Sequence, residues 1–232
     1  MGIRVRILDH TAKPLQSVYA AARTCYSSET PQTIWKAKAD RAKMEALVRK
    51  TIDAGHHSVL EHAAFVFALS GVSRACSHQL VRHRVASFSQ QSQRYVRSSR
   101  PDYVTPLSIA ASKPLHKEYQ RAIDTMFALY GKFTTHGIPN EDARFLLPNA
   151  AVTHLIMSMN LRELIHISAL RLCTNSQWEI RNLFRAVKDA LTRLDPFLGS
   201  LLQPRCEDLG YCPEMRCCGR LPRKIDVIGA KS

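Results

Sequence analysis

The stretch between His62 and Pro101 contains no acidic residue. Across the whole chain, 33 lysines and arginines outnumber 19 aspartates and glutamates, which gives a formal net charge of +14 and an isoelectric point near 9.8. Such a charge attracts anions of any kind, nucleic acids included. The acid-free stretch carries six arginines, whose planar guanidinium groups suit phosphate and carboxylate: Arg74, Arg82, Arg84, Arg94, Arg97 and Arg100. This concentration predicts a site for anionic ligands, with a solvated basic face as the simpler alternative.

Long apolar runs are also missing. The longest one, Ala63 to Leu69, is far shorter than the roughly 20 residues that a bilayer crossing takes. The start, Met-Gly-Ile-Arg-Val-Arg, lacks the apolar central stretch of a secretory signal. With 232 residues, 45% of them hydrophobic and 22% charged, the composition is that of an ordinary soluble globular protein. We therefore expect a cytoplasmic protein that binds no membrane.

Paired Cys-x-x-Cys knuckles, typical of zinc sites, do not occur. The chain has seven cysteines, an odd number that argues against a secreted disulfide framework. Four of them lie near the C-terminus: Cys206, Cys212, Cys217 and Cys218. We expect reduced, partly buried thiols there, with a structural metal site as the minor alternative. The group His56, His57, Glu61 and His62 lacks the His-Glu-x-x-His pattern, so no metal is expected there either.

Hydrophobic periodicity predicts strands scattered among longer helices. Strands are expected at Ile3–Asp9, Ala63–Leu69 and Val152–Met159, and an extended segment at Ser87–Val96. Helices are expected at Pro14–Thr24, Trp35–Ala54, Val72–His83, Pro106–Thr135 (one or two helices), from Pro139, at Asn160–Arg171 and at Gln177–Leu202. Because regular βαβ alternation is missing, we predict an α+β fold, with an antiparallel-type sheet packed with several long helices in a single domain. The division expected is a catalytic domain over residues 1–202 and a cysteine-rich tail over residues 203–232.

Three local signals mark helix ends. Gly55 stands where a C-terminal cap glycine belongs. Ser58 and Glu61 have the spacing of a capping box at a fresh helix start, which explains Glu61 better than a role as catalytic acid. Asn160 is expected to cap the helix that runs to Arg171.

Two arginines flank a histidine at Arg82-His83-Arg84, and Ser92 follows after seven residues. This arrangement resembles the signature of the flavin-dependent thymidylate synthases. Further stretches resemble the same family in the same order: Gly55 to His62, Glu141-Asp142-Ala143-Arg144 running into Leu147-Pro148, Asn160 to Leu164 ending in Leu170-Arg171, and Gln177-Trp178-Glu179. Together they span roughly residues 55 to 180, which is stronger evidence than one short motif.

The resemblance implies the fold and activity of that family. Such an enzyme methylates dUMP to dTMP, with the carbon taken from 5,10-methylenetetrahydrofolate and a hydride delivered by FAD that NADPH has reduced. It also implies a homotetramer whose flavin sites lie between subunits. All of these ligands are anionic, which agrees with the basic stretch. The other class of thymidylate synthase attacks uracil with a cysteine in a Pro-Cys setting, and this chain contains no Pro-Cys dipeptide.

The same resemblance assigns the site residues. Cofactor binding is expected at His56, Ser58, Arg82, His83, Arg84, Gln90, Asn160, Leu161, Arg162 and His166. Substrate binding is expected at Gln79, Leu80, Val81, Arg82, Gln90, Gln91, Ser92, Gln93, Arg94, Arg144 and Arg171. Arg171 is the expected catalytic residue, because a fixed cation beside the uracil ring stabilises the charge that develops as C5 becomes nucleophilic. The alternative for Arg171 is an arginine that complements a helix C-terminus.

Three positions depart from the family pattern. Gln90 stands where many members have glutamate, Asn175 where several have histidine, and His166 where asparagine is common. Two other functions compete with the synthase hypothesis. A basic nucleic-acid-binding protein would need more aromatic residues for base stacking than Phe88 and Tyr95. A metallohydrolase would use the cluster between His56 and His62.

Overall fold

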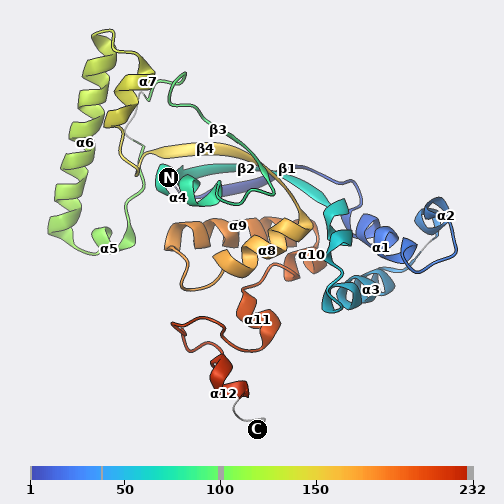
Figure 1. The fold of residues 1–232 in the computed structure, drawn as a ribbon. Coiled ribbons are helices and arrows are strands. Elements are labelled where there is room, and N and C mark those ends of the chain that lie inside the picture. Colours follow the sequence, from blue (N-terminus) through green and yellow to red (C-terminus); the bar gives the residue numbers. More distant parts are fainter. Residues whose placement is uncertain (1, 38, 99–101, 229–232) are drawn as a thin grey trace. The chain divides into compact units, whose positions relative to one another are not determined.

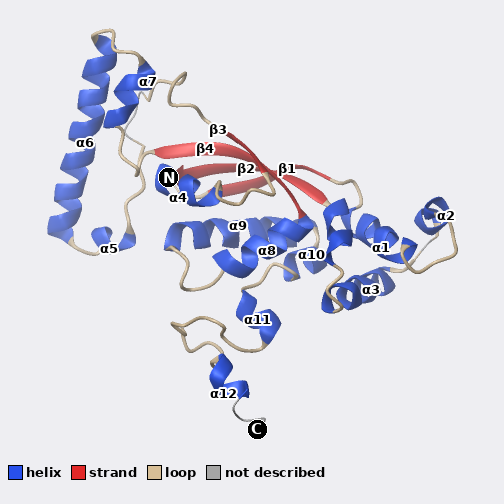
Figure 2. Cartoon of the chain, viewed as in Figure 1, coloured by secondary structure: helices blue, strands red, loops and turns tan. Residues whose placement is uncertain are grey.

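The computed structural model describes residues 2–37, 39–98 and 102–228. Four strands form one antiparallel sheet in the order β1-β2-β4-β3, and the other elements are helical (Figures 1 and 2). The strands are β1 (Arg4–His10), β2 (Ala64–Ser73), β3 (Ser87–Gln90) and β4 (Val152–Asn160). The predicted α+β class is confirmed. Among the described helices, none combines the length and the apolar character that a bilayer crossing requires.

The chain divides into two compact units. The first unit comprises Met1–Arg4, Leu69–Arg82 and Phe88–Ile156, and the second comprises Val5–Ala68, His83–Ser87 and Met157–Ser232. Arg100, one of the six arginines of the acid-free stretch, lies outside the described residues.

Within its described residues, the first unit holds five helical elements: α4 (Arg74–Leu80), α5 (Leu107–Ala110), α6 (Lys113–Thr135), α7 (Asn140–Ala143) and the 3₁₀ helix η2 (Arg144–Leu146). Ile123 and Phe127 lie on one face of α6 and pack against Ala151 in a small core. The hydroxyl of Tyr119 donates to the carbonyl of Val104 at 2.8 Å, which ties the preceding loop to α6. The two helices expected within Pro106–Thr135 and the short helix after Pro139 are confirmed.

Gly71 interrupts β2 with a left-handed backbone, φ +77°. A Cβ at this position would stand 2.5 Å from the carbonyl oxygen of Gly2. Both the positive φ and the close approach of the N-terminal backbone therefore require glycine here.

The second unit holds nine helical elements among the described residues: α1 (Pro14–Thr24), α2 (Pro31–Lys36), α3 (Arg41–Asp53), the 3₁₀ helix η1 (His57–His62), α8 (Leu161–Arg171), α9 (Trp178–Leu194), α10 (Pro196–Ser200), α11 (Arg205–Leu209) and α12 (Lys224–Ile228). Its core includes fully buried side chains on α8 and α9, among them Leu164, Ile167, Leu183, Phe184 and Val187. The strong amphipathic pattern of α9 explains why this helix turns one face to the core.

The long helix predicted over Trp35–Ala54 is wrong at its start. Trp35 belongs to α2, whose N-terminus is capped by the Thr30 hydroxyl accepting from the backbone N–H of Thr33. A second cap, the Asp40 carboxylate accepting from Lys43 N–H at 2.8 Å, starts α3 afresh. Two caps within ten residues therefore make two helices out of one apparent pattern.

Two other predicted helices are shorter than expected. The segment Val72–His83 starts as a helix only after Ser73, whose hydroxyl caps α4, and it ends at Leu80. The segment Gln177–Leu202 breaks at Asp195, which has extended backbone before Pro196. The residue before a proline is disfavoured in helical conformation, and the Asp195 carboxylate instead accepts from two N–H groups of α10.

Gly55 ends α3 as predicted. It has φ +79°, its N–H donates to Ile52 O at 2.9 Å, and His56 N–H donates to Thr51 O at 3.0 Å. This pair of bonds is the Schellman arrangement. The capping box at Ser58 is wrong, because the helix that follows is a 3₁₀ turn that begins at His57 without a side-chain cap. Glu61 instead pairs with Arg162.

Candidate active site

An open cavity of about 1210 Å³ lies within the second unit. Three of the residues predicted to bind the flavin border it: Asn160, Arg162 and His166. Its walls come from α3, η1, α8, α10 and α11, and they carry Arg49 and His57 as further basic groups. Small-molecule pockets typically measure about 300–1,000 Å³. The cavity is therefore large enough for a ligand of dinucleotide size.

Asn160 joins β4 to α8 directly. Its Oδ1 accepts from the Glu163 N–H at 2.9 Å, so the predicted cap is confirmed. The amide side chain also borders the cavity. The next residue, Leu161, has a fully buried side chain, and only its backbone is left for a ligand contact. One polar residue thus fixes the start of α8 and faces the cavity.

Arg162 forms an ion pair with Glu61, and both residues border the cavity. The Arg162 Nη1 lies 2.6 Å from the Glu61 Oε1, and both side chains are about half exposed. The neighbouring His56 and Ser58 are exposed, while Gly55 and His57 beside them border the cavity. The carboxylate of the cluster between His56 and His62 is thus paired with Arg162. Within the described ranges no group of three His, Cys, Asp or Glu side chains has metal-binding geometry.

Arg171 and His83 form a side-chain hydrogen bond within the predicted site. The Nε–H of Arg171 donates to Nε2 of His83 at 3.0 Å. His83 is buried, and burial together with the nearby charges of Arg171 and His166 lowers its pKa to about 4. The imidazole is therefore neutral near pH 7. Because Nε2 accepts a hydrogen bond, the proton of the ring is placed on Nδ1. Arg82 and Arg84 on either side are exposed.

The stretch of the first unit that was predicted to bind the nucleotide is a turn after Gln90. β3 ends at Gln90, the Val96 N–H donates to Ser92 O at 3.0 Å, and the Arg94 N–H donates to the Ser92 hydroxyl at 3.1 Å. The expectation that Ser87–Val96 is extended throughout is therefore wrong beyond Gln90. Ser92 and Arg94 are positioned by the turn and not by the alternation of a strand.

A second cavity, of about 200 Å³, lies against this turn. Gln91, Ser92 and Gln93 border it, as does Thr153. Two basic residues outside the predicted substrate-binding set border it as well: Arg97, which belongs to the acid-free stretch, and His154. The signal for His154 was its place on the outward face of β4, where burial alternates with a period of two.

Further predicted substrate residues of the first unit lie at the end of β3 and at the end of α4. Gln90 donates from Nε2 to the hydroxyls of Ser77 (2.9 Å) and Thr153 (3.1 Å), so its side chain is used inside the unit. Gln79, Leu80 and Val81 form the end of α4, and Leu80 is fully buried.

Arg94 and two further arginines, Arg144 and Arg74, belong to this region of the first unit. Arg94 Nε and Nη2 both lie 2.7 Å from the Glu141 carboxylate, and Arg144 Nε donates to the Glu141 carbonyl at 3.1 Å. Arg74 was not among the predicted substrate-binding residues. Burial lowers the pKa of its guanidinium, and the nearby like charge of Arg144 lowers it further. Several guanidinium groups within one region are typical of an anion site.

Asn175 has a partner in the C-terminal tail. Its Nδ2 donates to the carbonyl of Arg216 at 2.9 Å. The Asn175 side chain is therefore used to hold the tail.

Comparison with known proteins gives one consistent result. The family described as "Thymidylate synthase complementing protein" (Thy1) matches residues 6–197. The flavin-dependent thymidylate synthase of Nitratidesulfovibrio vulgaris is 40% identical over 94% of this chain and 95% of its own length. The enzyme of the same name from Geobacter sulfurreducens is 42% identical over 91% of each chain. A crystal structure of the flavin-dependent thymidylate synthase of Helicobacter pylori with FAD and dUMP is similar with a TM-score of 0.70 and 26% identity, covering 86% of this chain and 99% of that one.

Proposed function

The chain belongs to the thymidylate synthase complementing protein family, and on this premise we propose that it converts dUMP to dTMP as a flavin-dependent thymidylate synthase. The carbon comes from 5,10-methylenetetrahydrofolate, and NADPH and FAD supply the reduction. The observation that carries the proposal is the hydrogen bond between Arg171 and His83, 3.0 Å long. It joins the Arg-His-Arg segment to the end of α8, two motif segments that lie 88 residues apart in sequence.

We assign the large cavity of the second unit to FAD. Its volume suits a dinucleotide, and Arg49, Arg162 and His166 provide charge or hydrogen bonds for phosphate and ring oxygens. Asn160 presents an amide at the same wall. When bound and reduced by NADPH, FAD supplies a hydride to the nucleotide. The protein contributes position, electrostatic surroundings and shelter from water.

The turn at Ser92 and the cavity of about 200 Å³ beside it are assigned to dUMP. Ser92, Gln91 and Gln93 offer hydroxyl and amide groups, and Arg94 and Arg144 offer guanidinium groups for the phosphate. Arg94 forms an ion pair with Glu141 in the structure. Binding of a phosphate therefore competes with this exposed pair, which is worth little by itself.

Arg171 is assigned the catalytic role. Its guanidinium stays charged at any physiological pH, so a fixed positive charge is available for the uracil ring as C5 becomes nucleophilic. The bond to His83 uses the Nε–H of Arg171 and holds the side chain in one orientation. A neutral His83 accepts that bond without adding a second positive charge beside the first.

The first test is the colour and chemistry of the purified protein. We expect a yellow protein whose flavin absorbance bleaches on addition of NADPH with dUMP present, and which forms dTMP when the folate is added. Product formation is followed by chromatography of the nucleotides. A colourless protein that takes up no FAD, or one that binds DNA with a steep salt dependence and forms no dTMP, would refute the proposal.

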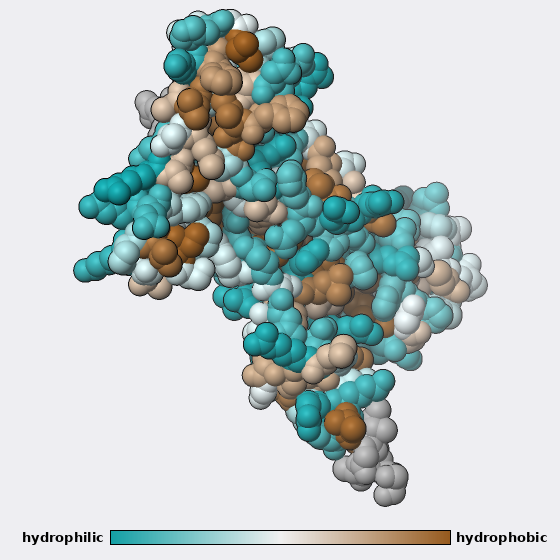
Figure 3. Space-filling view, turned by 60° about the vertical axis from the view of Figure 1, so that its left-hand side comes forward, coloured by the Kyte–Doolittle hydropathy of each residue, from teal (hydrophilic) through white to brown (hydrophobic). Residues whose placement is uncertain are grey.

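We further propose that the chain works as a homotetramer in the cytoplasm. Apolar side chains are exposed on α6 and the segment after it, where Figure 3 shows brown patches on the upper part of the molecule: Met126, Leu129, Phe133, Ile138 and Phe145. Such a patch supports a contact between subunits. Seven free thiols support a reducing compartment. Light scattering coupled to size-exclusion chromatography measures the assembly, and a monomeric mass for the active species would contradict it.

A further inference from the structure

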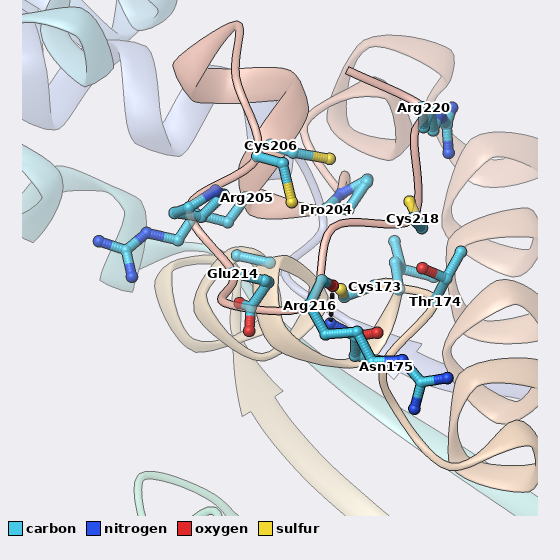
Figure 4. A pocket seen from close by; sticks show the side chains of 14 residues that line it. Cys173, Thr174, Asn175, Pro204, Arg205, Cys206, Glu214, Arg216, Cys218 and Arg220 are labelled. Atoms are coloured by element: carbon cyan, nitrogen blue, oxygen red, sulfur yellow. Dashed lines mark hydrogen bonds between the residues drawn. The ribbon is translucent and has the colours of Figure 1, made fainter. Parts of the chain in front are cut away.

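Four cysteine side chains surround one small cavity in the second unit. The cavity measures about 20 Å³ and is bordered by Cys173, Cys206, Cys212 and Cys218 (Figure 4). A cavity of roughly 10–15 Å³ already holds one water. The space therefore suits a single ion or water among sulfur atoms, and it is far too small for a cofactor.

The four thiols come from two places in the chain and lie near one another. Cys173 follows α8, while the other three are spaced by five residues each in the tail. The thiol of Cys206 is within electrostatic range of both Cys173 and Cys212. The thiol of Cys212 shares a hydrogen bond with that of Cys217 and is also within electrostatic range of Cys218.

The tail has almost no core that could hold it. Among the described residues 203–227, only Pro204 and Cys212 are buried, and Met215 is fully exposed. The amide of Asn175 donates to the Arg216 carbonyl and tethers the tail, whereas the ion pair of Arg220 with Glu207 lies within the tail itself. Segments of this size that cannot bury enough apolar surface are commonly held by a metal or a disulfide.

We propose that Cys173, Cys206, Cys212 and Cys218 bind one zinc ion, which fastens the C-terminal tail to the end of α8. Zinc takes four thiolates in a tetrahedron at about 2.3 Å. In the structure the four thiols border the cavity together with Arg205, Arg216 and Arg220, and no three of them stand at metal-ligand geometry. Zinc binding therefore requires the cysteine side chains to turn toward one another. Cys218 has hydrogen-bond donors in the Thr174 hydroxyl and the Arg220 backbone, an outer shell of the kind that orients a ligating sulfur.

The site has a consequence for the large cavity. α11 carries Cys206 and precedes the segment that holds Cys212 and Cys218. Its residues Glu207, Asp208 and Leu209 border that cavity. A fastened tail keeps this wall in place. The metal site itself does not depend on the proposed synthase function, because it is measured without substrate or flavin.

The test begins with the metal content of the full-length protein, purified under reducing conditions and measured by mass spectrometry of the elements. We expect one zinc per chain, and the visible bands of tetrahedral thiolate-bound cobalt after exchange. Chelation should lower the melting temperature of the unaltered protein, and added zinc should restore it. Cys206→Ser and Cys218→Ser should lose the metal, whereas Cys25→Ser, a change to an exposed thiol at the end of α1, should keep one equivalent.

Three outcomes would overturn the proposal. The first is a metal-free protein with all thiols free and a melting temperature that zinc does not change. The second is a mass lower by two hydrogens, which would show that a disulfide holds the tail instead. The third is full zinc content in Cys218→Ser with loss in Cys217→Ser, which would refute the assigned ligands.

Discussion

The guanidinium of Arg171 donates from Nε to Nε2 of His83 over 3.0 Å. The acceptor is a buried imidazole whose pKa is lowered to about 4 by burial and by the charges of Arg171 and His166. The contact fixes the arginine proposed to act on the uracil ring, and it depends on the charge state of the histidine.

Arg171→Ala is expected to keep bound flavin and to lose dTMP formation. Removing one preorganised group that stabilises a developing charge typically costs about 10²–10³ in turnover. The measurement is single-turnover formation of dTMP next to the flavin absorbance of the same sample. Arg185→Ala, at an exposed position of α9 with a local contact to Asn182, is the matched control and should keep full turnover. Normal dTMP formation by Arg171→Ala would remove this residue from the catalytic role.

His83 should make the protein less stable in acid. Its folded pKa is lowered from 6.5 to about 4, so between these values the unfolded chain binds more protons. Its contribution to stability is therefore complete above about pH 6.5 and is lost as the pH falls toward about 4. Chemical unfolding at several pH values should show this slope, and His83→Gln should reduce it. Direct titration of the imidazole by NMR gives the pKa, and a value near 6.5 would contradict the prediction.

Glu141→Gln is expected to tighten dUMP binding about two- to five-fold, because the phosphate no longer competes with an exposed pair of the kind worth ~0.2–1 kcal/mol. Arg94→Ala should weaken binding about 10- to 100-fold, the range for a hydrogen bond to a charged group. Calorimetric titration with dUMP measures both. Glu118→Gln makes the same change of charge on α6, where no ion pair is found among the described residues, and controls for the general field. Unchanged affinity in Arg94→Ala would show that the turn does not bind phosphate.

Two glycine substitutions should change stability in opposite directions. Gly71→Ala places a Cβ 2.5 Å from Gly2 O at φ +77°, and the backbone strain alone costs roughly 1–2 kcal/mol. Gly131→Ala, in the middle of α6 with nothing within 4 Å of the added Cβ, should stabilise by about 0.5–1 kcal/mol. Denaturant unfolding at one fixed protein concentration measures both. A Gly71→Ala protein as stable as its parent would show that this part of β2 adjusts freely.

The elements that sequence reasoning placed well are those with strong local signals. α1 agrees with its predicted bounds because Pro14 starts it and the apolar pattern continues to Thr24. The Gly55 cap and the Asn160 cap were predicted from single residues whose chemistry is specific. The boundaries that failed are those where a cap or a proline overrides periodicity, as Asp40 and Asp195 do.

The site could be predicted in its residue types but not in its internal partners. No sequence pattern shows that Glu61 pairs with Arg162 or that Gln90 donates to Ser77 and Thr153. These partners come from segments between 13 and 101 residues apart, brought together by packing. The cavity residues Arg49 and His154 were missed for the same reason, because their positions depend on which neighbours the fold gives them.

The strand-to-helix junction at Asn160 has no loop to absorb movement. A ligand bound at this amide would act on the first turn of α8, and the helix connects that turn to its last residue, Arg171. We therefore expect that FAD binding in the large cavity also restricts the movement of Arg171, the proposed catalytic residue. Slower hydrogen exchange of the backbone amides along the whole of α8 on FAD binding would show this restriction.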